Sequence, residues 1–234
     1  TVPDQALGPA VATAAAEAGI PLVATDDAIQ DANGNPVPFV GFNGRDMGTK
    51  VGQSAAELLQ GSGWLEGGDY GVLVTEVETL SVCMDRTNAA REQLAAAGVP
   101  EDKFISVPYD GTTDAALSAA GPIITGNSGI NNWVVVACND EGVLGTANAL
   151  RNAGYEPASV IAVGLGAYEA CRPWAEGIET GFRSALYLSG KDVGDAAARA
   201  LVAAIQDGTP LPAETVANTT MVTPENWESV MPCG

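Results

Sequence analysis

The chain has 234 residues, of which 46% are hydrophobic, and its formal net charge is −19. This acidic excess argues against nucleic acid as a partner, because phosphates require clustered lysine and arginine. The absence of histidine excludes Ser-His-Asp and Cys-His catalysis and most catalytic zinc sites. No apolar run approaches the roughly 20 residues that cross a bilayer, so we expect no membrane span.

The first part of the chain predicts a mixture of helices and strands. Its elements are a helix over 5–19, strands over 20–25 and 38–42, and a helix over 45–60. Residues 31–37 predict a tight turn, because they contain Asn-Gly and Asn-Pro. The turn is only weakly similar to a calcium loop, since no bidentate glutamate follows at the required spacing, and we expect no metal there.

From Tyr70 onward, strands and helices alternate regularly. The predicted strands cover 70–75, 103–107, 133–138, 159–164 and 182–188, and the predicted helices cover 81–97, 113–124, 140–153, 168–176 and 191–207. Such alternation indicates βαβ units, so we expect an α/β fold with parallel sheets that helices flank on both faces. Residues 215–223 again have β character.

Polar residues gather where the predicted strands end. They are Asp26, Asp27, Asn43, Glu76, Asn139, Asp140 and Glu169, the last in the loop that begins at Gly166, with Arg86 early in the helix after strand 70–75. Ligands bind at the carboxyl ends of parallel strands. Carboxylates, carboxamides and one guanidinium suit a neutral ligand with many hydroxyl groups, since each hydroxyl both donates and accepts. Any single one could instead be a helix cap or a surface charge, and Asp140 is a plausible N-cap.

The four cysteines allow three disulfide pairings. Cys83 and Cys138 each follow one of two strands that we expect to be neighbours. We therefore favour the pairs Cys83–Cys138 and Cys171–Cys233, with free buried cysteines as the alternative. Disulfides would favour an oxidising compartment over the cytosol.

Several short motifs together resemble a known family. They are Thr1-Val2-Pro3-Asp4-Gln5-Ala6-Leu7-Gly8, Ala24-Thr25-Asp26-Asp27, Asp31-Ala32-Asn33-Gly34, Arg86-Thr87, Asn139-Asp140 and Val143-Leu144-Gly145. The chain resembles, along essentially its whole length, the periplasmic L-arabinose-binding protein family, the type I sugar-binding proteins of ABC importers. The resemblance implies two lobes joined by three crossings that close on a monosaccharide.

The resemblance also implies lobe boundaries. The N-lobe would hold residues 1–41 and 189–218, and the C-lobe would hold residues 42–188 and 219–234. The family places further N-lobe strands and helices before the position of Thr1, so we expect an N-lobe that is incomplete in this chain, with the rest of it and any signal segment outside this sequence.

Four residues match ligand-binding positions of the family. Asp26 and Asp27 match its adjacent aspartates, of which the second takes the anomeric hydroxyl. Arg86 matches an arginine that reaches the ring oxygen, and Asn139 matches an asparagine that bonds a ring hydroxyl. These matches imply a ligand that is an arabinose-like pentose, a related sugar or a polyol.

Other positions depart from the family pattern. Gly166 replaces a second asparagine, for which Glu169 could compensate. Gly41 and Cys138 replace methionines near the sugar, so the pocket wall would be smaller, and Asn43 could add a polar contact. Because a site that lacks one partner for a hydroxyl discriminates strongly, these departures favour specificity for a sugar or polyol other than arabinose.

The implied partners are a small sugar or polyol and the membrane permease of an ABC importer, with no cofactor, no nucleic acid and a monomeric state. The location would be extracytoplasmic, either periplasmic or lipid-anchored at the cell surface. One alternative is the sugar-effector domain of a transcription repressor. A second is a sugar-modifying enzyme with Asp26 and Asp27 as an acid–base pair, although adjacent side chains in an extended strand point to opposite faces.

Overall fold

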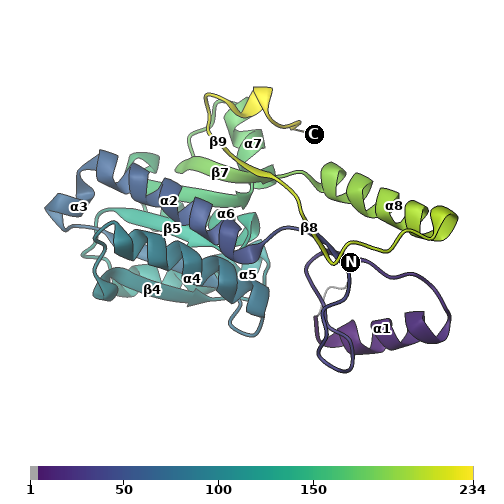
Figure 1. Cartoon of the computed structure of the whole chain (residues 1–234). Helices are drawn as coiled ribbons and strands as arrows, with labels where there is room; N and C mark the ends of the chain where they lie inside the picture. The colour runs from purple at the N-terminus through teal and green to yellow at the C-terminus, as the bar shows by residue number, and fades with distance from the viewer. Residues whose placement is uncertain (1–4, 234) are drawn as a thin grey trace. The chain divides into compact units, whose positions relative to one another are not determined.

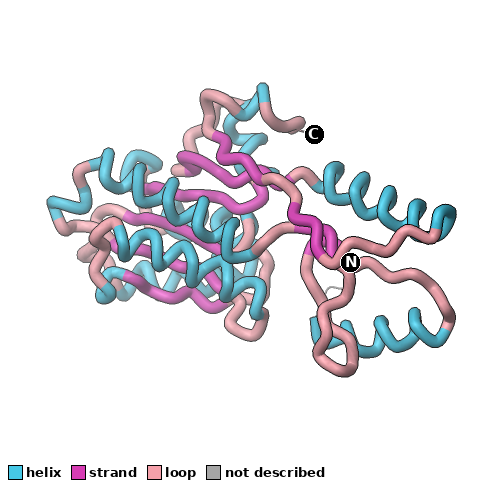
Figure 2. Tube along the Cα trace, in the orientation of Figure 1, coloured by secondary structure: helices cyan, strands magenta, loops and turns pink. Residues whose placement is uncertain are grey.

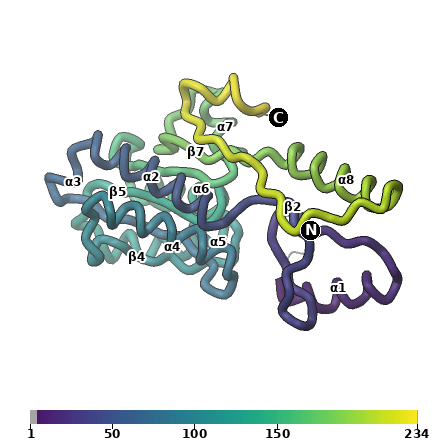
Figure 3. Tube along the Cα trace, viewed as in Figure 1, coloured from purple at the N-terminus to yellow at the C-terminus, as the bar shows by residue number. Residues whose placement is uncertain are grey.

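The computed structural model describes residues 5–233 and divides the chain into two compact units. Unit 1 combines the residues up to Asn43 with Ser189–Thr219, and unit 2 combines Gly44–Leu188 with the residues from Thr220 onward. Residues 1–4, which begin the first motif of the resemblance, and residue 234 lie outside the described part. The colours of Figure 3 show that unit 2 is nearly continuous in sequence, whereas unit 1 joins a purple and a yellow-green segment.

Unit 2 is built on a six-stranded sheet with the order β4-β3-β5-β6-β7-β9. The strands are β3 (Gly71–Glu76), β4 (Phe104–Pro108), β5 (Trp133–Ala137), β6 (Val160–Gly166), β7 (Phe182–Leu188) and β9 (Thr219–Val222). The pairings β3–β4, β3–β5, β5–β6 and β6–β7 are all parallel. Figure 2 shows these strands as a magenta layer among cyan helices.

Helices cover this sheet. They are α2 (Gly44–Ser62), α3 (Trp64–Gly67), α4 (Ser81–Ala96), α5 (Thr113–Gly126), α6 (Asp140–Asn152) and α7 (Tyr168–Ala175), with short 3-10 turns at Glu101–Lys103, Pro157–Ser159 and Trp227–Ser229. Helix α2 packs against α4, and α5 packs against α6. In Figure 1, α2 and α4 lie side by side on the face of the sheet toward the viewer.

Burial explains why β5 is a central strand. Trp133, Val134 and Val135 are all fully buried, so both faces of the strand are covered. This is the environment that a continuous apolar run predicts.

Small residues allow α2 to approach α4 closely. A Cβ on Gly52 would lie 2.7 Å from the Cα of Ala90, so only glycine fits at this position of the helix contact.

Unit 1 is much smaller. Its parallel sheet has the order β1-β2-β8, formed by β1 (Ala24–Asp26), β2 (Phe39–Gly41) and β8 (Glu214–Val216). Its helices are the 3-10 turn Gln5–Leu7, α1 (Gly8–Glu17) and α8 (Gly190–Asp207). One core cluster consists of Ala24, Ile29, Val37 and Phe39.

The tight turn predicted over 31–37 is present in unit 1. The Asp31 carboxylate accepts hydrogen bonds from the backbone N–H groups of Asn33 and Asn35 at 2.8 and 2.9 Å. Gly34 in the same turn has a φ of 81°. Backbone N–H groups of the turn are therefore hydrogen-bonded by a side chain of the same turn.

Two strand predictions are wrong in detail. The strand predicted over 20–25 begins only at Ala24, and Pro21, which has no N–H to donate, lies in its non-strand portion. The segment predicted over 215–223 divides into β8 and β9, which join different sheets. Sheet membership depends on tertiary pairing, which local β character does not determine.

The predicted α/β class with parallel, helix-flanked sheets is confirmed. Within residues 5–233, none of the helices combines the length and the apolar character needed to cross a bilayer.

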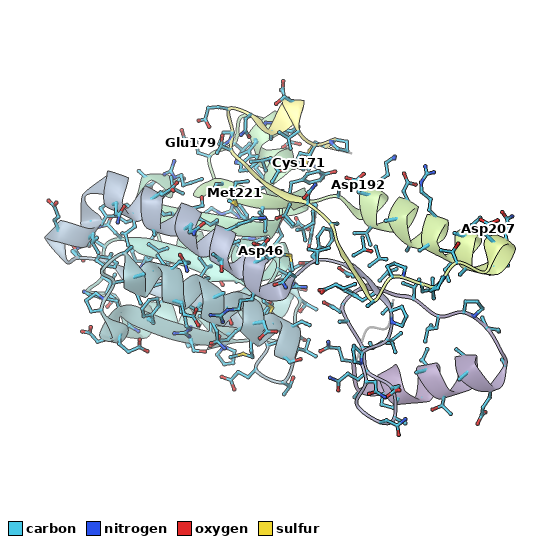
Figure 4. The ribbon with its side chains drawn as sticks, viewed as in Figure 1. Asp46, Cys171, Glu179, Asp192, Asp207 and Met221 are labelled. Atoms are coloured by element: carbon cyan, nitrogen blue, oxygen red, sulfur yellow. A yellow bond between two sulfur atoms is a disulfide. The ribbon has the colours of Figure 1, made fainter. Side chains whose placement is uncertain are left out.

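Unit 2 contains two disulfides, and they are the two pairs favoured above. Cys83 is bonded to Cys138, and Cys171 is bonded to Cys233. The second bond attaches the C-terminal segment to α7, where Figure 4 labels Cys171.

Candidate functional site

In unit 2, the candidate residues lie at the carboxyl ends of β3, β5 and β6. Arg86 lies in the second turn of α4 and is partly buried. Its Nη1 donates a hydrogen bond of 3.0 Å to the carbonyl oxygen of Cys138, the residue that follows β5. Arg86 is therefore placed directly beside the strand end that carries Asn139.

Asn139 is the N-cap of α6. Its Oδ1 accepts hydrogen bonds from the Gly142 N–H at 2.9 Å and from the Tyr109 hydroxyl at 2.5 Å. Its Nδ2 donates to the Gly111 carbonyl at 3.0 Å. A carboxamide has two N–H donors, and within residues 5–233 only one of those of Asn139 has a partner, so the other can donate to a ligand hydroxyl. The hydrogen bonds with Tyr109, Gly111 and Gly142 fix the orientation of the Asn139 carboxamide.

Tyr109 was not among the predicted site residues. Burial is the main reason that the pKa of its hydroxyl is raised, which keeps the group protonated as a donor to Asn139. The hydroxyl also lies 3.3 Å from the Cys138 sulfur. Its position directly after β4 is the signal that could have identified it, since the other candidates also follow strands.

Asp140 has a different role from the one predicted. Asn139, not Asp140, caps α6, and the Asp140 side chain is fully buried. Its Oδ2 accepts a 3.0 Å hydrogen bond from the Glu169 N–H at the start of α7, while its Oδ1 has no partner within the described residues. Burial raises the pKa of Asp140 to about 6. This carboxyl connects the loop after β5 to the loop after β6.

The loop after β6 explains why position 166 is glycine. Gly166 has a φ of 136°, and a Cβ there would collide with the Tyr168 ring. Ala167 follows with a φ of 68°. Tyr168, also missed from the sequence, is half-exposed, and its hydroxyl donates to the Glu141 carboxylate at 2.6 Å. An aromatic ring therefore lies where the resemblance expects a second asparagine. Glu169 is partly buried at this end of α7.

Two candidates at strand ends of unit 2 are buried within its interior. Glu76 accepts hydrogen bonds from the hydroxyls of Thr87 and Ser106 at 3.0 and 2.5 Å, and pairs with Arg91 at 3.1 Å. The side chain of Cys138 is in a disulfide and is only 4% exposed, while its carbonyl accepts the hydrogen bond from Arg86.

Unit 1 carries Asp26, Asp27 and Asn43. Asp26 ends β1, is exposed and has a φ of 74°. The expectation that the two aspartates alternate as in a regular extended strand is therefore wrong. Asp27 is partly buried, and Asn43, two residues after β2, is exposed. At Gly41 a Cβ would lie 2.5 Å from the Phe39 ring, so this ring occupies the space that a methionine side chain would need.

The site has the chemistry of a binding surface for a neutral polar ligand. In unit 2 its groups are the guanidinium of Arg86 and the carboxamide of Asn139, both held by hydrogen bonds, with the carboxylate of Glu141 bonded to Tyr168 nearby in sequence. Within residues 5–233, no three histidine, cysteine, aspartate or glutamate side chains are placed to hold a metal ion.

Known proteins share both the sequence and the fold. The chain is 32% identical over 233 residues to the ABC transporter L-arabinose-binding periplasmic protein of Azospirillum brasilense, covering 97% of this chain and 70% of the relative. It is 28% identical over 191 residues to the L-arabinose-binding periplasmic protein of Escherichia coli K12, covering 80% of this chain and 58% of that relative.

A solved structure supports the same assignment of fold. It is a periplasmic solute-binding protein of an ABC transporter from Actinobacillus succinogenes 130z with bound D-allose, with a TM-score of 0.78 at 21% identity over 97% of this chain and 77% of that one. The model of the periplasmic binding protein domain matches residues 2–210. The chain therefore belongs to the periplasmic binding protein family and has its type I fold.

Proposed function

We propose that this chain is an extracytoplasmic solute-binding protein that captures a monosaccharide for an ABC importer. The observation that carries the proposal is that Arg86 bonds to the carbonyl of Cys138, the residue directly before the oriented carboxamide of Asn139, at the carboxyl end of β5. A sugar ring oxygen accepts from a guanidinium, and a ring hydroxyl accepts from the remaining amide donor.

The ligand would be an arabinose-like pentose, a related sugar or a polyol. The relatives from A. brasilense and E. coli are named for L-arabinose, and the A. succinogenes structure contains D-allose. The absence of a side chain at Gly166 and the ring of Tyr168 beside it make the wall of this site different from the family pattern. We therefore expect specificity to depend on Tyr168 and Glu169.

In this proposal the two units act as lobes. One lobe would comprise residues 1–41 and 189–218, and the other residues 42–188 and 219–234. Asp26 and Asp27 would bind the sugar from the first lobe, with Arg86 and Asn139 from the second. Binding would select a closed form, which a membrane permease recognises.

Capture would involve no chemical step. The buried Asp140 carboxyl, whose pKa is raised, faces backbone groups of α7 and serves as a structural link. The protein would act as a monomer, in the periplasm or attached by a lipid to the cell surface. The two disulfides support an oxidising location.

The test is a thermal-shift screen against L-arabinose, D-ribose, D-allose, D-galactose and myo-inositol, followed by calorimetric titration. A ligand at 100 times its Kd stabilises the folded state by about 2.7 kcal/mol. For a chain of this size, the melting temperature should rise by roughly 5–10 °C.

Two variants make the test specific. Arg86→Ala should abolish most of the shift, whereas Arg172→Ala, which removes the same charge from an exposed position of unit 2, should leave it unchanged. An equal shift in both variants would remove Arg86 from the site. If the bound sugar were converted into a product, the protein would be an enzyme. If none of these sugars raised the melting temperature, the proposed function would be contradicted.

A further inference from the structure

The Cys83–Cys138 disulfide lies within the candidate site. Cys83 is in the first turn of α4, one turn before Arg86, and Cys138 directly precedes Asn139. Both cysteines are almost completely buried, at 2% and 4% exposure. The bond thus joins the helix that carries one ligand-binding candidate to the strand end that carries the other.

Noncovalent contacts continue from this bond to both candidates. The Cys83 sulfur accepts a hydrogen bond from the Val77 N–H at 3.0 Å, which connects α4 to the loop after β3. The Cys138 carbonyl accepts from Arg86, and the Cys138 sulfur lies against the Tyr109 hydroxyl that donates to Asn139. Each candidate is therefore held by a group that is attached to the disulfide or in contact with it.

Through its hydroxyl, Tyr109 links the disulfide to the orientation of the Asn139 carboxamide. The hydroxyl can donate to the Asn139 Oδ1 only while its ring stays packed in the small cluster of Val77, Leu80, Cys83, Tyr109 and Cys138. Removing the bond between the two sulfurs leaves the centre of this cluster without its covalent link. The carboxamide of Asn139 would then lose one of the contacts that set its direction.

We infer that the Cys83–Cys138 disulfide is a positioning element for sugar binding. It holds Arg86 and Asn139 in the arrangement that the ligand requires, and its reduction lowers affinity for the sugar. This inference rests on the proposed function, because it names what orients the residues of that same site.

The second disulfide provides a matched control in the same unit. Cys171–Cys233 closes a loop with a sequence separation of 62 residues, against 55 for Cys83–Cys138. In the chain-entropy model, stabilisation depends on the logarithm of loop length, so the two bonds should stabilise the fold almost equally. Cys171 and Cys233 pack against the main hydrophobic core of unit 2, and within residues 5–233 neither is a hydrogen-bond partner of Arg86 or Asn139. A difference in sugar affinity between the two deletions therefore reports positioning and not general stability.

The experiment compares the double variants Cys83→Ala/Cys138→Ala and Cys171→Ala/Cys233→Ala with the parent protein. Each is titrated well below its own melting temperature with the sugar that gives the largest thermal shift among the five above. We expect the first variant to bind at least tenfold more weakly and the second to bind within twofold of the parent. Equal affinities in all three proteins, or an equal loss in both variants, would overturn the inference.

A reversible version avoids a failure of the first variant to fold. In the Cys171→Ala/Cys233→Ala protein only Cys83–Cys138 remains, so reduction opens that bond alone. Affinity should fall on reduction and return on reoxidation. Unchanged affinity after complete reduction, verified by alkylation of two thiols, would overturn the inference.

Amide hydrogen exchange gives a readout that needs no ligand. The Gly142 N–H donates to the Asn139 side chain, so its exchange should be at least tenfold faster without Cys83–Cys138 and unchanged without Cys171–Cys233. If the parent protein binds none of the five sugars, the proposed function fails, and exchange at Gly142 still decides whether the disulfide positions Asn139. Equal exchange in both variants would overturn the positioning role.

Discussion

The two units present their candidate ligand-binding residues in different ways. In unit 2, Arg86 and Asn139 follow strands of six and five residues and are held by contacts to several loops. In unit 1, Asp26 ends a strand of three residues, is exposed and has a left-handed backbone conformation. The difference teaches that a long, doubly covered sheet fixes side chains at its edge through packing, whereas a short sheet relies on local backbone geometry.

The largest expected effect tests the packing that supports unit 2. In Gly48→Ala, the new Cβ would collide with the Arg86 carbonyl oxygen, so α2 and α4 must separate. We expect the free energy of unfolding to fall by about 3 kcal/mol, at the upper end for overpacking. The matched control is Gly61→Ala in the same helix, where no atom lies within 4 Å of the new Cβ. Chemical denaturation should show that control to be neutral or stabilised by up to about 1 kcal/mol.

The next effect concerns pH and the buried carboxyl of Asp140. Its folded-state pKa is about 6, above the 3.8 of an exposed aspartate, so the native state binds the proton more tightly than the unfolded state. Stability from this group is therefore fully present below about pH 4 and is lost as pH rises through 6. A shift of about two units corresponds to roughly 3 kcal/mol.

Comparison with Asp140→Asn isolates this contribution. The stability of the parent relative to Asp140→Asn should decrease between pH 4 and pH 7 in parallel denaturation series. Asp110→Asn is a control of opposite sign, because the hydrogen bonds from Thr112 lower the pKa of Asp110. For that pair the relative stability of the parent should decrease as pH falls. If the stability difference between the parent and Asp140→Asn did not change with pH, the native carboxyl of Asp140 would be solvated and its pKa would not be raised.

A smaller effect separates capping from ligand binding. Asn139→Ala removes the N-cap of α6 together with the proposed ligand donor, whereas Thr112→Ala removes the N-cap of α5 and a hydrogen bond to Asp110 but no proposed ligand donor. Each should lose about 1 kcal/mol of stability. Only Asn139→Ala should weaken sugar binding, by about 1–3 kcal/mol or roughly 5- to 150-fold in Kd. Equal affinities measured by titration calorimetry would exclude Asn139 from the site.

The smallest effect tests the local geometry of unit 1. Asp26→Gly removes the strain of a left-handed φ and should stabilise the fold by up to about 1 kcal/mol, while sugar affinity falls. Gly34→Ala is the mirror control, because Gly34 also has a positive φ with no neighbouring atom. It should lose about 1 kcal/mol in a thermal melt without changing affinity. Higher affinity in Asp26→Gly would contradict a role in binding.

Periodicity in the sequence was sufficient for the fold of unit 2, since its buried strands are continuous apolar runs and its helices end at glycines such as Gly98 and Gly154. It was insufficient for β8 and β9, because adjacent residues with equal β character pair with strands that are distant in sequence. Strand ends indicated where Arg86 and Asn139 lie.

The sequence did not predict which side chains of the site are buried or which hydrogen-bond partners they have. Nothing local distinguishes Glu76, which is enclosed by Thr87, Arg91 and Ser106, from an exposed carboxylate. Likewise, the ring of Tyr168 over Gly166 depends on two unusual backbone conformations in succession, and the alanine at 167 gives no sign of one of them.

The division of the chain has a consequence for the order of folding. Every strand of unit 2 except β9 pairs only with neighbours inside the continuous segment Gly44–Leu188. In unit 1, β2 must pair with β8, which is synthesised only after nearly all of unit 2. Pairing over such distances is slow, because a long loop must close first. During synthesis, unit 2 can therefore acquire its sheet early, and completion of the small β1-β2-β8 sheet sets the time at which the whole chain reaches its native state.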